Sequence, residues 1–139
     1  MKYIVSLSLL TLLLSSAMIQ RNTHPKPQSS GYQPDSGKII YETYCLACHQ
    51  EDGSGVPNMN PPLIKTDWVL GDSTRLINVI LKGLKNTEIN GESYSNEMPA
   101  HDFLTDYQIA EVLTHIRKSF GNQASAISSE DVKTQRAKK

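Results

Sequence analysis

The sequence predicts an all-α domain of three to five helices joined by long loops. Apolar residues recur at helical spacing in several segments, whereas no segment shows the alternation of apolar and polar residues that is typical of a strand. The intervening segments are rich in Gly and Pro, which favour loops. Long loops leave few residues for an apolar core, so we expect the domain to fold around a large group at its centre.

The amino terminus has the pattern of an export signal. A short charged start is followed by a run dominated by Leu, Ile and Val over residues 3–14 and then by small residues. We expect residues 1–17 to be a signal peptide, although an uncleaved membrane anchor over residues 3–19 fits the same pattern. Residues 18–34 are rich in Pro, Gln, Ser and Asn, which predicts a flexible linker. The domain is therefore expected in the periplasm or at the outer face of the cytoplasmic membrane.

Two helices are predicted in the first part of the domain. The first starts after Asp35 or Ser36, either of which can cap it, and ends near Ala47. The second is predicted over residues 72–84 from its helical pattern of apolar residues, which are Leu76, Ile77, Val79, Ile80 and Leu84. Gly and Pro residues predict a long loop after each helix.

The last predicted helix has the clearest signal. Thr105 and Gln108 form a capping box, and Gly121 supplies a stop. Between them the apolar residues recur at i, i+3, i+4 and i+7, at Ile109, Val112, Leu113 and Ile116. We therefore expect the domain to span residues 35–120, followed by a disordered basic tail over residues 121–139.

The charge balance argues against a nucleic-acid-binding protein of the basic-patch kind. The chain has 14 Lys plus Arg and 14 Asp plus Glu, and its formal net charge is zero. The domain is mildly acidic, with 7 basic and 11 acidic residues over 36–120. A partner with a basic patch is therefore favoured.

Residues 45–49 read Cys-Leu-Ala-Cys-His, which is the attachment pattern of c-type haem. On a helical turn, positions i, i+3 and i+4 project from one face, so both sulfurs and the imidazole can address one planar ligand. We expect Cys45 and Cys48 to form thioethers with the haem vinyl groups and His49 to bind the iron. One covalently attached haem c is expected, and covalent attachment suits an exported protein because a haem held only by packing could be lost outside the cell.

Three other interpretations of the cysteine pair remain open. A thioredoxin-like redox site requires a βαβ setting, which the sequence does not predict. A structural zinc site requires four ligands, and only a distant His would remain after these three residues. A plain disulfide is the third alternative in an exported protein.

Met98 is the candidate for the second axial ligand of the iron. Met59 follows His49 by only ten residues, in a loop that is expected to wrap the same side of the haem. Met98 stands before a proline, at the end of a long loop and just ahead of the last helix, where it can reach the opposite face. The alternative role for Met98 is to fill a gap in the core. His101 is interpreted as a surface or capping residue and His115 as a packing residue.

With these residues the chain resembles the class I cytochrome c family over residues 35–120. Gly37, Tyr41 and Cys45 match the Gly, the aromatic residue and the haem cysteine of the family's first helix. Residues 98–100, with the sequence Met-Pro-Ala, are similar to the family's distal-ligand segment. The resemblance implies a small fold of helices and long loops wrapped around the haem, with His49 and Met98 as the two iron ligands.

The resemblance also implies roles for residues outside the attachment pattern. Pro61 or Pro62 looks like the family's proline whose carbonyl accepts the N–H of the proximal histidine, and Pro62 is the candidate cofactor contact. Trp68 is similar to the tryptophan that hydrogen-bonds a haem propionate, and its alternative role is that of a core aromatic residue. His115 stands where the family usually has an aromatic residue, which is a departure from the pattern.

These residues predict an electron-transfer protein, not an enzyme. If His49 and Met98 both bind iron, no coordination site remains for substrate, and the soft thioether raises the reduction potential. The partners would be redox proteins such as a dehydrogenase, a reductase or a terminal oxidase, with the N-terminal segment as a membrane tether. Two alternatives remain: a haem subunit fixed in a dehydrogenase, oxidase or nitrite reductase complex, and a ligand-binding haem protein in which Met98 does not ligate.

Overall fold

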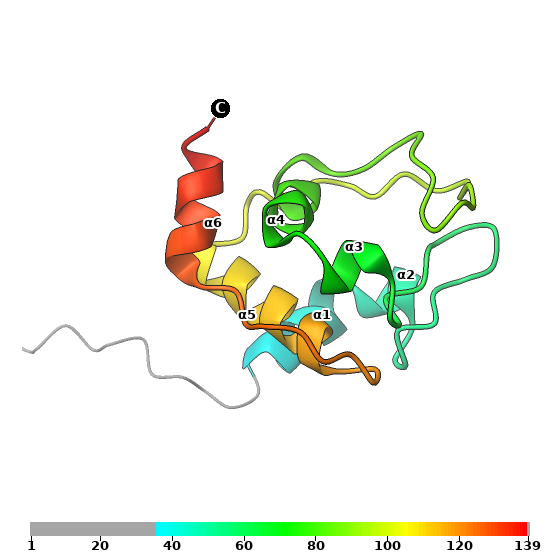
Figure 1. Cartoon of the computed structure of the whole chain (residues 1–139), viewed down its shortest axis with the longest axis horizontal. Helices are drawn as coiled ribbons and strands as arrows, with labels where there is room; N and C mark the ends of the chain where they lie inside the picture. Colours follow the sequence, from blue (N-terminus) through cyan, green and yellow to red (C-terminus); the bar gives the residue numbers. More distant parts are fainter. Residues whose placement is uncertain (1–35, 139) are drawn as a thin grey trace, which may run out of the picture. The chain divides into compact units, whose positions relative to one another are not determined.

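The computed structural model describes residues 36–138, which form six helices and long connecting segments (Figure 1). The export signal, the anchor and the linker predicted for residues 1–34 lie outside the described residues. Within residues 36–138 there are isolated β-bridges but no strand, so the prediction of an all-α fold is confirmed. This range has six helices, and the expected number of three to five is therefore too low. None of the helices in this range is long and apolar enough to cross a membrane. The helices are α1 (Ser36–Tyr44), α2 (Leu46–His49), α3 (Asp67–Leu70), α4 (Ser73–Lys82), α5 (Asp106–Lys118) and α6 (Ser129–Arg136).

Helices α1 and α2 are almost continuous. The predicted first helix is interrupted at Cys45, but the Cys45 N–H still donates to the Tyr41 carbonyl at 2.8 Å and the His49 N–H donates to the Cys45 carbonyl at 2.9 Å. The helical turn that carries the two sulfurs and the imidazole is therefore preserved across the interruption.

Helix α1 crosses α5 at a point of close backbone approach. Gly37 is buried in α1, and a Cβ atom built there would lie 2.3 Å from the Glu111 carbonyl oxygen of α5. The Ser36 hydroxyl donates a hydrogen bond to the Glu111 carboxylate at the same crossing. Only a residue without a side chain lets the two helices approach this closely.

Helices α4 and α5 follow their sequence signals. The Asp72 carboxylate accepts from the Thr74 N–H at 2.8 Å and caps α4. Thr105 and Gln108 form the expected capping box at the start of α5. The two helices contribute most of the apolar core, including Ile77, Ile109 and Leu113, each at most 1% exposed, and short α3 packs against both. The core therefore lies beside the segment that carries the attachment pattern.

The prediction of a disordered tail over residues 121–139 is wrong for most of that segment. Helix α6 packs against α4 and α5, with Ile127 and Val132 buried in the main core. Ser128 and Asp131 form a capping box at its start. The segment is polar except for a few residues, and Ile127 and Val132 are the two that enter the core. Burial of their side chains offsets the entropy lost on ordering.

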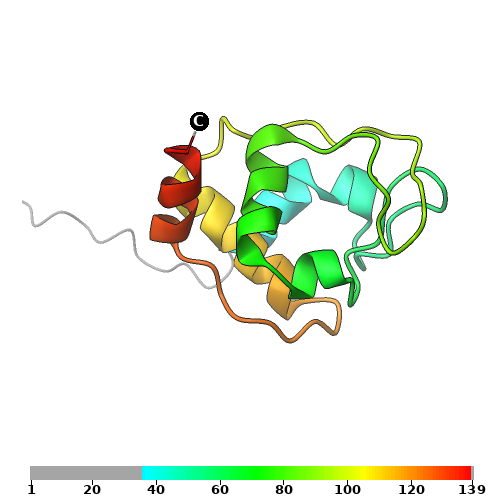
Figure 2. The same ribbon diagram turned by 45° about the horizontal axis from the view of Figure 1, so that its top comes forward.

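Two long loops, residues 50–66 and 83–105, lie on the side of the domain that carries α2 and α3, away from α6 (Figures 1 and 2). They contact each other through backbone hydrogen bonds, since the Ser95 N–H donates to the Asn58 carbonyl at 2.9 Å and the Asn96 N–H donates to the Met59 carbonyl at 3.1 Å. These hydrogen bonds hold the two loops together.

Candidate functional site

The attachment residues lie on one helical turn and differ in how far they are exposed to solvent. His49 is buried, Cys45 is half-buried and Cys48 is exposed. The Cys45 carbonyl accepts from the N–H groups of both Cys48 and His49, at 3.1 and 2.9 Å, which holds positions i, i+3 and i+4 in helical register. The two thiols are free and not joined to each other. This arrangement makes both sulfurs available to a group on the same side as the imidazole.

His49 is fixed by the loop that follows it. Its Nδ1 lies 3.0 Å from the Pro61 carbonyl oxygen, and because a carbonyl only accepts, Nδ1 carries the proton and donates. Nε2 then holds the free lone pair that a metal ion requires. Burial lowers the pKa of His49, an effect that the Pro61 hydrogen bond partly offsets, so the imidazole stays neutral at neutral pH.

The acceptor is thus Pro61, whereas the sequence assigned the cofactor contact to Pro62. The choice follows from a turn at Gly55, which has a φ of +69° and lies against the Pro61 backbone. A Cβ atom at Gly55 would be 2.4 Å from the Asn60 carbonyl oxygen, so this residue must be glycine for the loop to fold back on itself. Pro62 lines the cavity described next.

Two connected cavities lie beside His49, with volumes of about 740 and 610 Å³ that include space open to solvent. The cavities share one set of lining residues and are lobes of one space, here called the central cavity. The shared residues are Cys45, His49, Pro61, Leu84, Ile89 and Met98.

Met98 lines both lobes of the central cavity. Its backbone forms an antiparallel bridge with Leu84, in which the Met98 N–H donates at 2.9 Å and the Met98 carbonyl accepts at 3.0 Å. This bridge ties the segment before α5 to the chain that leaves α4. Met59 is 46% exposed and lines neither lobe. The structure therefore brings Met98, and not Met59, to the same cavity as His49.

Trp68 lies on α3 and lines the second lobe. The Arg75 guanidinium stacks over its ring at 4.4 Å from the centroid, which is cation–π geometry. This contact fixes the ring at the cavity wall. The hydrogen bond from Trp68 to a haem propionate remains a prediction.

Sequence reasoning missed several cavity residues in the segment between α4 and α5. Ile89 is only 4% exposed and lines both lobes, although its neighbours show no helical or strand period. The available signal was the Asn90-Gly91 turn, which closes a bridge between Ile89 and Glu92 and turns the Ile89 side chain inward. Tyr94 and Lys85 also line the first lobe.

The two histidines outside the attachment pattern have different surroundings. His101 lines the first lobe and belongs to an exposed aromatic cluster with Tyr44 and Phe103, with ring centroids 6.4 and 5.7 Å from its own. His115 packs at the α1–α5 crossing, 5.6 Å from the Tyr41 ring. His115 thus fills the place of the aromatic residue that the resemblance called for.

The electrostatics of the cysteine pair disfavour thiol–disulfide exchange. Burial raises the pKa of the Cys45 thiol to about 11, and the nearby Cys48 sulfur adds to this effect. Redox-active cysteines have lowered pKa values, because the thiolate is the reactive form. A half-buried neutral thiol at the wall of the central cavity fits attachment to a large apolar group better.

Comparison with known proteins decides the family, because the cytochrome c family model matches residues 34–120. The chain belongs to the cytochrome c family. It is 36% identical over 117 residues to the cytochrome c-552 of Thermus thermophilus, an alignment that covers 77% of this chain and 88% of that protein. Proteins of this family carry covalently attached haem c, and the free sulfurs, the neutral imidazole and the central cavity of this chain fit that cofactor.

Subunits of larger enzymes are also similar to this cytochrome. The cytochrome c subunit of the quinone-dependent alcohol dehydrogenase of Gluconobacter oxydans is 34% identical over 107 residues, which is 75% of this chain and 22% of that subunit. The fructose dehydrogenase cytochrome subunit of Gluconobacter japonicus is 30% identical over 131 residues, which is 88% of this chain and 26% of that subunit. The chain thus spans about a quarter of these subunits. It belongs to a family of electron-transfer proteins.

Proposed function

We propose that this cytochrome is an exported one-electron carrier whose haem iron is held by His49 and Met98. The observation that carries the proposal is that His49 and Met98 line both lobes of one cavity, which the attachment cysteine Cys45 also lines. The bound haem supplies an iron that gains and loses one electron. The chain supplies the attachment, the ligands and an apolar enclosure that excludes water.

The two ligands have different roles: His49 is held in a fixed orientation, and Met98 sets the reduction potential. The Pro61 hydrogen bond orients the imidazole of His49 and increases its basicity as a ligand. A thioether from Met98 is a soft ligand that favours the reduced iron and raises the reduction potential. With both positions filled, no site is open for substrate, which argues against the ligand-binding alternative.

Electrons would enter and leave where the first lobe meets the surface. Tyr44 is 43% exposed and Phe103 is 62% exposed, and their ring centroids lie 5.4 Å apart. Tyr44 also lines the first lobe, together with the exposed Cys48. Exposed aromatic residues are typical of the centres of protein interfaces. We propose that a redox partner docks on this aromatic surface, weakly and over a small area, as electron-transfer partners do.

A second role, as the haem domain of a dehydrogenase complex, is supported by the similar dehydrogenase subunits. In this role the partner would be permanent and the docking surface would be covered. Export through the signal over residues 1–17, either cleaved or kept as an anchor over residues 3–19, belongs to both roles. The intact mass of the protein recovered from the periplasm and from the membrane distinguishes a cleaved signal from an anchor.

The absorption spectrum of the haem-loaded protein tests the ligand assignment. In the ferric state we expect low-spin iron and the weak near-infrared band of a sulfur-to-iron bond. Met98→Ala is expected to abolish the band and lower the potential, whereas the control Met59→Ala leaves both unchanged because Met59 lines neither lobe. High-spin iron that binds carbon monoxide in the unmodified protein would instead indicate an open site.

A further inference from the structure

Helix α6 lies beyond residue 120, where the match to the family model ends. It is anchored by Val132, which is fully buried, and it lies against both α4 and α5. These two helices flank the chain that contains Met98, because α4 precedes it and α5 follows it. Helix α6 can therefore restrain the chain between α4 and α5 that contains Met98.

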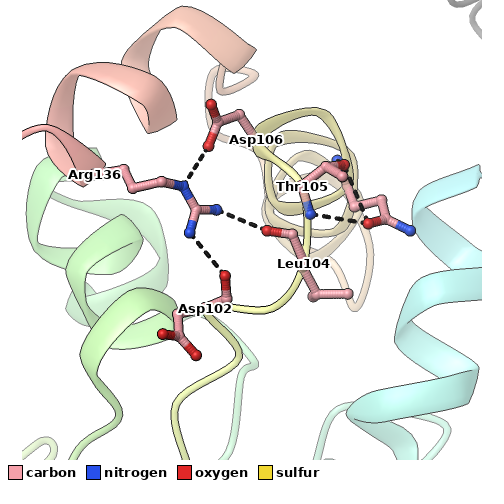
Figure 3. A network of polar contacts seen from close by, with 6 residues as sticks. Asp102, Leu104, Thr105, Asp106 and Arg136 are labelled. Atoms are coloured by element: carbon pink, nitrogen blue, oxygen red, sulfur yellow. Dashed lines mark hydrogen bonds and ion pairs between the residues drawn. The ribbon is translucent and has the colours of Figure 1, made fainter.

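Arg136, at the end of α6, makes three charge-assisted hydrogen bonds to the segment that leads into α5 (Figure 3). Its Nε donates to the Asp106 carboxylate at 2.7 Å, and its two Nη groups donate to the carbonyl oxygens of Asp102 at 2.8 Å and Leu104 at 2.7 Å. The Arg136 and Asp106 side chains are 30% and 29% exposed, so water screens the contact only in part. The planar guanidinium fork fixes all three acceptors relative to one another.

The segment that Arg136 holds begins four residues after Met98. Between the two, the His101 N–H donates to the Ile80 carbonyl of α4 at 2.7 Å, and the Leu104 N–H donates to the His101 carbonyl at 3.1 Å. The chain from Met98 to α5 is thus held at three successive points: the Leu84 bridge, α4 and Arg136. A shift of this chain would therefore move Met98 relative to the cavity.

We propose that Arg136 is a positioning residue for Met98, and that α6 is a strap that keeps the methionine thioether at the iron. The inference rests on the proposed function, because it requires Met98 to be an iron ligand. When Arg136 is removed, the chain over residues 102–106 loses its outer restraint. Met98 then dissociates from the iron more often, although the haem stays attached through its cysteines.

The test is the rate at which imidazole replaces Met98 in the full-length, haem-loaded ferric protein. At high imidazole concentration this rate is limited by dissociation of the Met98 thioether. Arg136→Gln is expected to raise the limiting rate about tenfold, because it removes the charge-assisted hydrogen bonds that restrain residues 102–106. Asp106→Asn, which removes only the carboxylate charge, is expected to give a smaller increase.

Lys133→Gln is the matched control, because it also removes one positive charge from α6. Lys133 is 69% exposed, and its ion pair with Glu130 lies within the same helix. It is expected to leave the imidazole rate unchanged. If Arg136→Gln lowers the unfolding midpoint but leaves the imidazole rate equal to that of Lys133→Gln, Arg136 is only structural and the proposal is wrong. If the unmodified protein lacks the sulfur-to-iron band, the ligand assignment fails first and this proposal falls with it.

Discussion

Replacing Gly37 by Ala is expected to destabilise the folded protein by about 2 kcal/mol, although alanine favours helices. The Cβ atom would lie 2.3 Å from the Glu111 carbonyl oxygen and 2.8 Å from the His115 Cβ, where ordinary contacts are 3.4–4 Å. Backbone atoms cannot rotate away, so α1 and α5 must separate. Overpacking of this kind costs roughly 1–3 kcal/mol or somewhat more, and the gain in helix propensity of about 1 kcal/mol offsets only a part.

The assay is guanidinium unfolding of the ferric protein with its haem attached, followed by circular dichroism. Glu42→Ala is the control, because this residue of α1 is 46% exposed and its ion pair with Lys38 stays within the helix. It is expected to change the free energy of unfolding by less than about 0.5 kcal/mol. A Gly37→Ala protein as stable as the control would refute the reasoning that the α1–α5 crossing is limited by backbone contact.

Three further changes test single features of the structure. Gly83→Ala is expected to weaken the near-infrared sulfur-to-iron band, because Gly83 has a φ of +72° and a Cβ atom there would lie 2.5 Å from the Met98 carbonyl oxygen; an unchanged band would contradict this. Thr105→Ala removes the capping box of α5 and should lower the free energy of unfolding by about 1 kcal/mol, measured by urea unfolding with an unchanged slope. Asn122→Leu leaves one buried and two part-buried backbone groups without their Asn122 partner and should cost about 3 kcal/mol in the same assay. A loss smaller than that of Thr105→Ala would show that water replaces those hydrogen bonds.

Signals that act within a few residues were readable from the sequence. The attachment pattern of Cys45, Cys48 and His49 needs only one helical turn, so its geometry follows from its spacing. The Thr105 capping box likewise depends on residues three apart. In each case the relevant contacts lie inside a single turn, and tertiary packing did not override them.

Structural features that depend on contacts between residues far apart in the sequence could not be predicted from local patterns. The choice of Pro61 over Pro62 depends on the turn at Gly55, and a shift of one residue in that loop would reverse it. Helix α6 was missed because Ile127 and Val132 are isolated in a polar segment and gain stability only against α4 and α5. Two apolar residues hardly change the composition of a polar segment, so composition does not predict their burial. Burial depends on where each residue lies in the fold.

A redox titration of the haem-loaded protein, followed by its absorption spectrum, tests whether the iron keeps two protein ligands. We expect one reversible one-electron step, with iron that stays low-spin in both states, because His49 and Met98 remain bound throughout. Loss of that step, or a change to high-spin iron on reduction, would contradict the assignment of this cytochrome as an electron carrier with two protein ligands.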